Sequence, residues 1–272
     1  MIQYNDHRIK LLFEKLSNEN RGGLGVFITA SDPSLEISQD ILAGLPAAGA
    51  DMIEFGMPFS DPMADGPTIQ ESSVRSLANG TKINDIFEIV ISIRKLNNEI
   101  PIILMGYYNS IFNLGIDNFT AKCAETGVDG LIIVDLQPEE DSELYTKSKE
   151  KNIDLIRLIT PTTDQNRLIT ILSNASGFLY YVTVTGITGQ NSANIEDLKK
   201  SINTIKSSTK LPIVAGFGIK NRNDVEQIST FTDGVVVGSS IVNIIKENLK
   251  DKNKMINEIK LFTKDLKEGI KE

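Results

Sequence analysis

The feature that most constrains this fold is a regular alternation of short apolar runs with longer amphipathic stretches. Eight runs rich in β-branched residues each precede a stretch whose apolar residues have helical spacing. The predicted strands cover residues 26–29, 52–55, 102–105, 130–134, 155–159, 177–182, 211–215 and 234–237. Continuously apolar strands are typical of a parallel sheet that is buried on both faces.

The predicted helices complete the pattern. They cover residues 7–19, 35–45, 68–78, 84–96, 116–126, 139–151, 164–172, 195–205, 224–229, 240–248 and 255–267. Eight strand–helix units in a chain of this length favour a closed barrel over an open doubly wound sheet. The fold class is therefore α/β: a (β/α)8 TIM barrel with an additional N-terminal helix. No linker or low-complexity segment interrupts the pattern, so residues 1–272 are expected to form a single TIM-barrel domain.

Composition excludes several classes of function. The formal net charge of −8 argues against a nucleic-acid partner, because phosphate backbones are bound by basic patches. The single cysteine, Cys123, suits a reducing compartment, and the single histidine, His7, makes a histidine-based or metal site improbable. No apolar run suits a signal peptide or a membrane span. We expect a cytoplasmic protein with no metal and no membrane association.

A carboxylate stands inside the second apolar run. Glu54 lies in that run, and the following loop carries Asp61 and Asp65 among three prolines that stiffen it. A buried, unpaired carboxylate is unfavourable by several kcal/mol. This arrangement indicates an acid–base pair held at a cleft. It also fits a structural interpretation, in which Glu54 caps a neighbouring turn and the loop aspartates are solvated.

Glycines follow the last three predicted strands. They occur in residues 185–189, 216–218 and 238–240, together with serine and threonine. Glycines let the backbone approach a ligand, and a helix N-terminus offers free N–H groups. In neighbouring positions of a barrel, these loops predict a phosphate site built from backbone amides. Each loop by itself is a weak signal, since a glycine after a strand usually forms just a tight turn.

The segment of residues 53–67, IEFGMPFSDPMADGP, closely resembles the signature of the tryptophan synthase alpha subunit. The resemblance extends over nearly the whole chain. Further matching segments are FITASDP at 27–33, MGYYN at 105–109, YYVTVTGITG at 180–189, GFGI at 216–219 and GSSI at 238–241.

This resemblance implies a lyase that cleaves indole-3-glycerol phosphate to indole and glyceraldehyde 3-phosphate by a retro-aldol reaction. It implies that Glu54 moves protons at the ring carbon and the glycerol hydroxyl, while Asp65 stabilises the ring N–H as it becomes positive. No cofactor is expected in this chain. The expected partner is a beta subunit that carries pyridoxal phosphate and takes up the indole, in an α2β2 assembly.

Other residues carry over from the family position by position. Phe27, Met105, Ile132 and Phe217 match the indole slot, with Tyr107 and Tyr180 nearby, although apolar residues at strand ends often simply pack. Gly189, Gly218, Gly238 and Ser239 match the phosphate site, Thr188 matches a loop that closes on Asp65, and Pro58 and Asp61 match positions near the beta-subunit contact.

The chain departs from the family pattern at three places. Ser31 stands where glycine is commoner, Gln137 stands where a second proline is commoner, and the residues after Gly189 lack an arginine that many members carry. None of these touches the proposed acids or the phosphate glycines, so activity is expected to persist.

Three alternatives remain. A stand-alone lyase of the same fold, releasing free indole, would keep both acids and the phosphate glycines. A non-catalytic allosteric barrel would be expected to have lost Glu54 or Asp65, and both are present. A generic phosphosugar isomerase would usually need a lysine or histidine base at a strand end, and no predicted strand ends in histidine.

Overall fold

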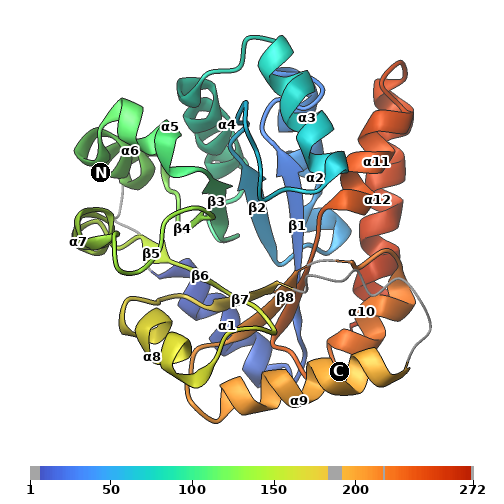
Figure 1. Cartoon of the computed structure of the whole chain (residues 1–272). Coiled ribbons are helices and arrows are strands. Elements are labelled where there is room, and N and C mark those ends of the chain that lie inside the picture. Colours follow the sequence, from blue (N-terminus) through green and yellow to red (C-terminus); the bar gives the residue numbers. More distant parts are fainter. Residues whose placement is uncertain (1–6, 183–191, 217, 271–272) are drawn as a thin grey trace.

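The computed structural model describes residues 7–182, 192–216 and 218–270. Within these residues, nine parallel strands form one sheet in the order β5-β4-β3-β2-β1-β9-β8-β7-β6, which curves into a nearly closed barrel (Figure 1). The strands are β1 (Gly23–Thr29), β2 (Met52–Gly56), β3 (Ile102–Gly106), β4 (Gly130–Ile133), β5 (Asp154–Leu155), β6 (Arg157–Ile159), β7 (Leu179–Val182), β8 (Ile213–Gly216) and β9 (Gly234–Val237).

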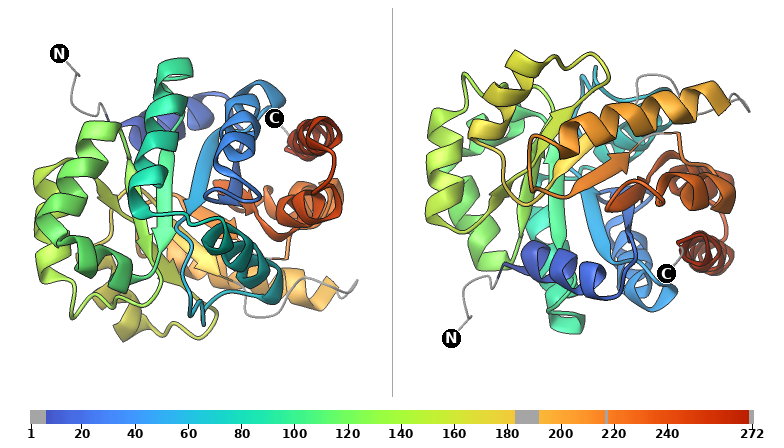
Figure 2. Two further views of the ribbon diagram at one scale, coloured as in Figure 1. Left: turned by 90° about the horizontal axis from the view of Figure 1, so that it is seen from above. Right: turned by 90° about the horizontal axis from the view of Figure 1, so that it is seen from below.

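Helices surround the barrel (Figure 2). They are α1 (Arg8–Asn18), α2 (Leu35–Gly44), the short 3-10 helix η1 (Pro46–Ala48), α3 (Pro67–Ala78), α4 (Ile83–Leu96), α5 (Tyr108–Leu114), α6 (Ile116–Thr126), α7 (Ser142–Glu150), α8 (Gln165–Ser173), α9 (Ser192–Lys206), α10 (Arg222–Ile228), α11 (Ser239–Glu247) and α12 (Lys252–Glu268). The predicted TIM barrel with its extra N-terminal helix is confirmed. No helix of the described residues combines the length and apolarity needed to cross a bilayer.

Local sequence signals explain where several helices begin. The Ser34 hydroxyl accepts a hydrogen bond of 3.3 Å from the N–H of Ile37 at the start of α2. The Asp164 carboxylate accepts one of 2.8 Å from the N–H of Arg167 at the start of α8. Serine and aspartate at these positions satisfy backbone donors that the first helical turn leaves free.

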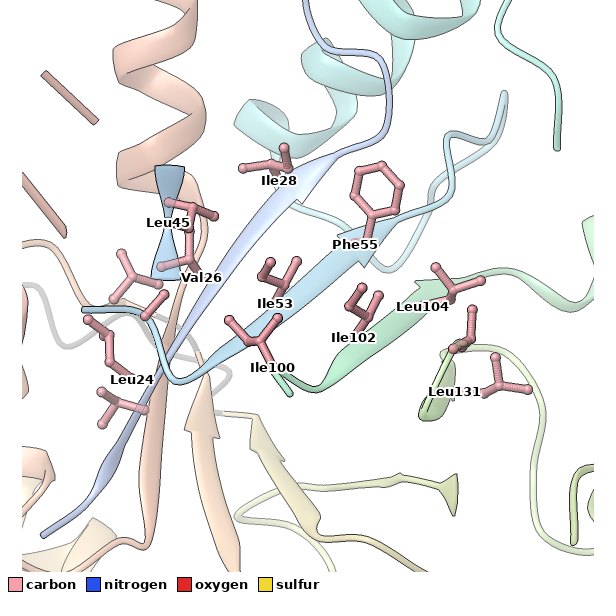
Figure 3. Packing of buried hydrophobic residues seen from close by; sticks show 14 of the residues in the cluster. Leu24, Val26, Ile28, Leu45, Ile53, Phe55, Ile100, Ile102, Leu104 and Leu131 are labelled. Atoms are coloured by element: carbon pink, nitrogen blue, oxygen red, sulfur yellow. The ribbon is translucent and has the colours of Figure 1, made fainter. Parts of the chain in front are cut away.

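The alternation of side chains along each strand produces two apolar clusters. Outward-facing residues such as Val26, Ile53 and Leu104 pack between the sheet and the helices (Figure 3). Inward-facing residues such as Met52 and Ile103 form a second cluster inside the barrel. Side chains alternate between the two faces of a strand with a period of two. The directions of Met52 and Ile53 therefore determine the face of β2 to which the next side chain, that of Glu54, points.

Helix α1 closes the N-terminal end of the barrel. Its residues Ile9, Leu12 and Leu16 are buried and belong to the interior cluster. The view from below in Figure 2 shows α1, in dark blue, on this side of the sheet. Since this end is covered by apolar packing, chemistry is left to the opposite end, where the strands terminate.

Two details differ from the sequence-based prediction. The fifth strand is split at Ile156, where the chain changes from pairing with β4 to pairing with β7 and so brings the barrel round towards closure. Helix α5 was not predicted. Its first N–H groups include that of Tyr108, which donates a hydrogen bond of 2.8 Å to the Asp135 carboxylate. That cap comes from the end of β4, so local sequence does not reveal it.

Candidate active site

Glu54 points into the barrel. On β2, Ile53 and Phe55 face the helices, while Met52 faces the interior, so the side chain of Glu54 also faces inward. Its nearest strand neighbours in register are Phe27 on β1 and Ile103 on β3. Only 2% of Glu54 is exposed. The buried strand carboxylate expected from the sequence is thus present.

The surroundings of Glu54 favour its protonated form. Burial raises the pKa of its carboxyl from an ordinary 4.5 to about 8; a hydrogen bond from the Tyr180 hydroxyl opposes this shift and the charge of Asp65 adds to it. An acid with this pKa is protonated in about half or more of the molecules near neutrality and readily returns to the ionised form. Glu54 therefore suits both proton donation and proton acceptance.

Asp65 is tied to the end of β3. The Tyr107 hydroxyl donates a hydrogen bond of 3.0 Å to Oδ2 of Asp65 and accepts one of 2.9 Å from the N–H of Ala64. The ring of Phe59 stacks on Tyr107, with centroids 4.9 Å apart. Burial raises the pKa of Asp65, and the hydrogen bond from Tyr107 opposes that rise by stabilising the carboxylate.

Both acids line one cavity of about 80 Å³ at the C-terminal end of the barrel. Its lining residues are Phe27, Glu54, Asp65, Gly66, Ile69, Met105, Tyr180, Gly218, Ile219, Val236, Gly238 and Ser239. A smaller adjoining space of about 10 Å³ shares Asp65 and Met105 with it and is also bordered by Tyr107. The structure thus brings together most of the residues expected from the sequence.

The cavity lining also includes glycines and the start of a helix. Gly238 is the N-cap residue of α11, and no side chain of the described residues caps this helix start. Gly218 has a φ of +74°, a conformation that glycine adopts without strain. Free N–H groups at a helix start favour a bound anion. This arrangement supports the predicted phosphate site.

Several predicted residues lie elsewhere. Ile132 is fully buried in the interior cluster and does not line the cavity. Pro58 is half-buried and Asp61 is exposed in the loop after β2. Thr188, Gly189 and Phe217 lie outside the described residues, as do the first two residues of the arginine-free segment after Gly189, whereas its next residues begin α9.

Sequence reasoning missed four lining residues: Gly66, Ile69, Ile219 and Val236. Val236 occupies an inward position of β9, so strand alternation was a usable signal for it. Ile69 lies in the first turn of α3, and its place at the cavity follows from how that helix packs on the barrel.

The structure shows the backbone conformation of one residue that departs from the family pattern and the hydrogen-bond partner of another. Ser31 has a φ of +57°, a backbone conformation that favours glycine. Gln137 accepts a hydrogen bond of 2.7 Å from Arg167 of α8, which ties its loop to the helix. Neither residue contacts Glu54 or Asp65.

A second, larger and open groove of about 1350 Å³ lies at the other end of the barrel, beside α1. Two of the charged residues that line it form ion pairs: Lys206 with Asp233 at 2.9 Å, and Arg21 with Asp51 at 2.9 Å. It lacks a pair of neighbouring buried acids. The smaller cavity around Glu54 is therefore the better candidate for chemistry.

Comparisons with known proteins identify the family of this chain. The family described as "Tryptophan synthase alpha chain" matches residues 13–271. The crystal structure of tryptophan synthase subunit alpha from Legionella pneumophila str. Paris is 36% identical, with a TM-score of 0.90, covering 96% of this chain and 97% of that one.

Two further solved structures are similar. A structure from Aquifex aeolicus VF5 is 34% identical, with a TM-score of 0.89, covering 97% of this chain and 99% of that one. Tryptophan synthase from M. tuberculosis, in an open form with BRD0059 bound, is 27% identical, with a TM-score of 0.86, covering 96% of this chain and 98% of that one. With its barrel, its paired acids and a family match over nearly its full length, this chain belongs to the tryptophan synthase alpha chain family.

Proposed function

We propose that this chain cleaves indole-3-glycerol phosphate to indole and glyceraldehyde 3-phosphate, using Glu54 and Asp65. The observation that carries the proposal is that these two acids and the start of α11 line the same cavity. Membership of the alpha chain family supports a lyase role in tryptophan synthesis, and the acid pair supports this particular reaction.

The reaction requires a proton to move from oxygen to carbon. Glu54, in its protonated form, donates a proton to the ring carbon that bears the glycerol chain, which leaves the ring nitrogen positive. The glycerol hydroxyl then gives its proton to the Glu54 carboxylate left by the first step, its carbon becomes the aldehyde, and the bond between that carbon and the ring breaks. The bonding electrons return to the ring and regenerate indole. A carboxyl with a pKa of about 8 suits both proton steps.

Asp65 stabilises the positive ring. Its carboxylate accepts a hydrogen bond from the ring N–H, and that bond strengthens as the nitrogen becomes positive. Tyr107 holds Oδ2 of Asp65 in place. The apolar walls formed by Phe27, Ile69 and Met105 suit the flat indole ring.

The phosphate binds to backbone groups of the cavity lining. The N–H groups at the start of α11, beside Gly238 and Ser239, and the backbone at Gly218 approach it without a lysine or arginine. This explains how a chain with a net charge of −8 accommodates a phosphate. General acid–base chemistry is sufficient for the cleavage, so the proposal requires no cofactor on this chain.

The partner in this proposal is a tryptophan synthase beta subunit that carries pyridoxal phosphate and takes up the indole, in an α2β2 assembly. Two large apolar side chains support a contact surface at the active-site end: Met63, 87% exposed in the loop of Asp65, and Phe112, 66% exposed on α5. Pro58 and Asp61 lie in the same loop as Met63. Where exposed apolar side chains form a contiguous patch, that patch often marks a protein contact.

The deciding experiment measures glyceraldehyde 3-phosphate formed from indole-3-glycerol phosphate, with and without a beta subunit from the same organism. We expect slow turnover alone and a strong rise when the partner is added. Fast turnover that does not respond to the partner would instead establish the stand-alone lyase. Absence of turnover in both conditions would overturn the proposed reaction.

A further inference from the structure

The buried face of α3 is polar. Helices that pack on a barrel usually bury apolar side chains, but the buried residues of α3 are Ser72, Ser73 and Ser76. Apolar contact on this helix comes from half-buried residues such as Ile69, which packs against the interior cluster. Directional hydrogen bonds supplement this contact, and they constrain position more tightly than apolar contact does.

Three of these contacts reach the end of β1. The hydroxyls of Thr29 and Ser72 lie 2.6 Å apart. Ser76 donates a hydrogen bond of 2.5 Å to the carbonyl of Ala30. The side chain of Arg75 makes a bidentate contact with Asp32, with Nε and one terminal nitrogen each 2.8 Å from a carboxylate oxygen. Asp32 is fully buried and the Arg75 side chain is 20% exposed.

The same helix holds the catalytic loop directly. Gln70, in the first turns of α3, donates from Nε2 to the backbone carbonyl of Asp65 at 2.9 Å and to that of Pro62 at 3.4 Å. Asp65 lies two residues before the helix begins. A shift of α3 along β1 would therefore move Asp65 with it.

The end of β1 also fixes the position of Glu54. Phe27 of β1 pairs in register with Glu54 of β2, and the N–H of Ala30 donates a hydrogen bond of 2.8 Å to the carbonyl of Gly56. The same stretch of backbone at the end of β1 thus positions both acids. It positions Glu54 through the sheet and Asp65 through α3.

We propose that Gln70 and the Arg75–Asp32 pair are positioning residues that set the placement of Asp65 opposite Glu54. The inference rests on the proposed function, since it assigns these residues to the same reaction. Gln70, Arg75 and Asp32 are not among the residues that line the cavity, so they act on the chemical step and leave substrate binding largely unchanged.

The first test replaces Gln70 by methionine, which has a similar length and no donor. For Gln70→Met we expect kcat to fall by about 10- to 100-fold, because a displacement of about 1 Å is enough for such a loss. KM should stay within about threefold of its value in the unmodified chain, because the substitution removes no contact that substrate and transition state make equally. Glycerol 3-phosphate, followed by calorimetry, should bind as before.

The matched control is Glu71→Gln. Glu71 is the next residue on α3, half-exposed, and its carboxylate pairs with Lys246 of α11 at 2.5 Å. An exposed ion pair contributes little, so this variant should keep its kcat. A loss in Glu71→Gln equal to that in Gln70→Met would show a general effect of disturbing α3 and would overturn the assignment.

The second test concerns the ion pair, whose disruption leaves a buried charge. Arg75→Gln alone should lower kcat and the melting temperature. The double variant Asp32→Asn/Arg75→Gln keeps a hydrogen-bonded pair without charge, so it should recover a large part of the lost kcat. Recovery of stability without recovery of kcat would overturn the positioning role of this pair.

The outcomes separate the two proposals. No turnover by the unmodified chain, with or without the beta subunit, would overturn the proposed function and this role for Gln70 with it. Turnover by the unmodified chain and an unchanged kcat in Gln70→Met would overturn only the positioning role. Parallel losses of kcat and glycerol 3-phosphate binding would also contradict it.

Discussion

The hydroxyl of Tyr107 lies 3.0 Å from Oδ2 of Asp65 and donates a hydrogen bond to that carboxylate. The same hydroxyl accepts a hydrogen bond from the N–H of Ala64. One phenol therefore holds both the carboxylate of Asp65 and the backbone beside it. Tyr107 is 4% exposed. Its removal should therefore act on catalysis through Asp65.

For Tyr107→Phe we expect kcat to fall by about 10- to 100-fold, because a hydrogen bond to a charged group is worth about 1.5–3 kcal/mol. Steady-state kinetics of the indole-3-glycerol phosphate cleavage measures this. Tyr108→Phe is the matched control, since Tyr108 does not line the cavity. Equal activity of Tyr107→Phe and the unmodified chain would contradict the ordering role of the phenol.

Replacing Glu54 by glutamine should abolish turnover and leave the fold and the binding of glycerol 3-phosphate intact. Glutamine is close in size to glutamate and cannot exchange a proton in the required range. The measurement is turnover under substrate saturation, together with calorimetry of glycerol 3-phosphate binding. Near-normal turnover would refute the proton-transfer role of Glu54.

The same substitution should change how stability depends on pH. Between its ordinary pKa of 4.5 and the folded value of about 8, Glu54 binds a proton in the folded chain but not in the unfolded one. Its contribution to stability is therefore present at low pH and is lost as pH rises from about 4.5 to about 8, by roughly 5 kcal/mol at most.

Glu54→Gln should accordingly be more stable than the unmodified chain at pH 9, with the difference disappearing near pH 4. Urea unfolding of both proteins at several pH values measures it. A stability difference that does not vary with pH would show that the pKa of Glu54 is not raised by folding.

Asp65→Asn should lower kcat by about 10³-fold, because an amide supplies no negative charge to the ring nitrogen. Asp61→Asn is a suitable control, since Asp61 lies in the same loop but is exposed and outside the cavity. Measuring kcat for both variants without the beta subunit avoids effects on assembly. Retention of most of the rate by Asp65→Asn would refute the stabilising role of this carboxylate.

Gly216 on β8 is packed against Tyr180, which lines the cavity. A Cβ at this position would lie 2.1 Å from the hydroxyl of Tyr180, the residue that hydrogen-bonds to Glu54. Gly216→Ala should therefore displace Tyr180 and lower kcat by at least about tenfold. In Gly22→Ala the new Cβ would meet only an ordinary contact of 3.6 Å, so that variant should behave normally. Normal kinetics of Gly216→Ala would show that Tyr180 moves without consequence.

Ser31 offers a route to a more stable chain. Its φ is +57°, and its buried hydroxyl has no hydrogen-bond partner among the described residues. Glycine relieves both problems, so Ser31→Gly should raise the free energy of unfolding by about 1 kcal/mol. Ser34→Ala, which removes the cap of α2, should lower it by about 1 kcal/mol. Urea unfolding compares them, and a loss of stability in Ser31→Gly would contradict this interpretation of the turn.

Much of the fold was predictable because it depends on patterns within short segments of the sequence. Alternating strands and helices, the Glu54 carboxylate within an apolar run, and the glycine-bearing loops are features of short segments. Helix α5 was not predictable in this way, because the carboxylate that caps it, Asp135, comes from the end of another strand. The place of Val236 at the cavity could have been predicted from the alternation of side chains along β9. The place of Ile69 could not, because it depends on how α3 packs on the barrel.

The sequence by itself determined the barrel, the family resemblance and the two candidate acids, since backbone periodicity and a long signature need no long-range information. Only the tertiary structure decided the pKa of Glu54 and the position of Asp65. The raised pKa of Glu54 follows from burial beside Asp65, and the placement of Asp65 follows from Tyr107 and Gln70. These effects depend on desolvation and on hydrogen bonds between residues distant in the chain, and they exist only once the barrel has closed around them.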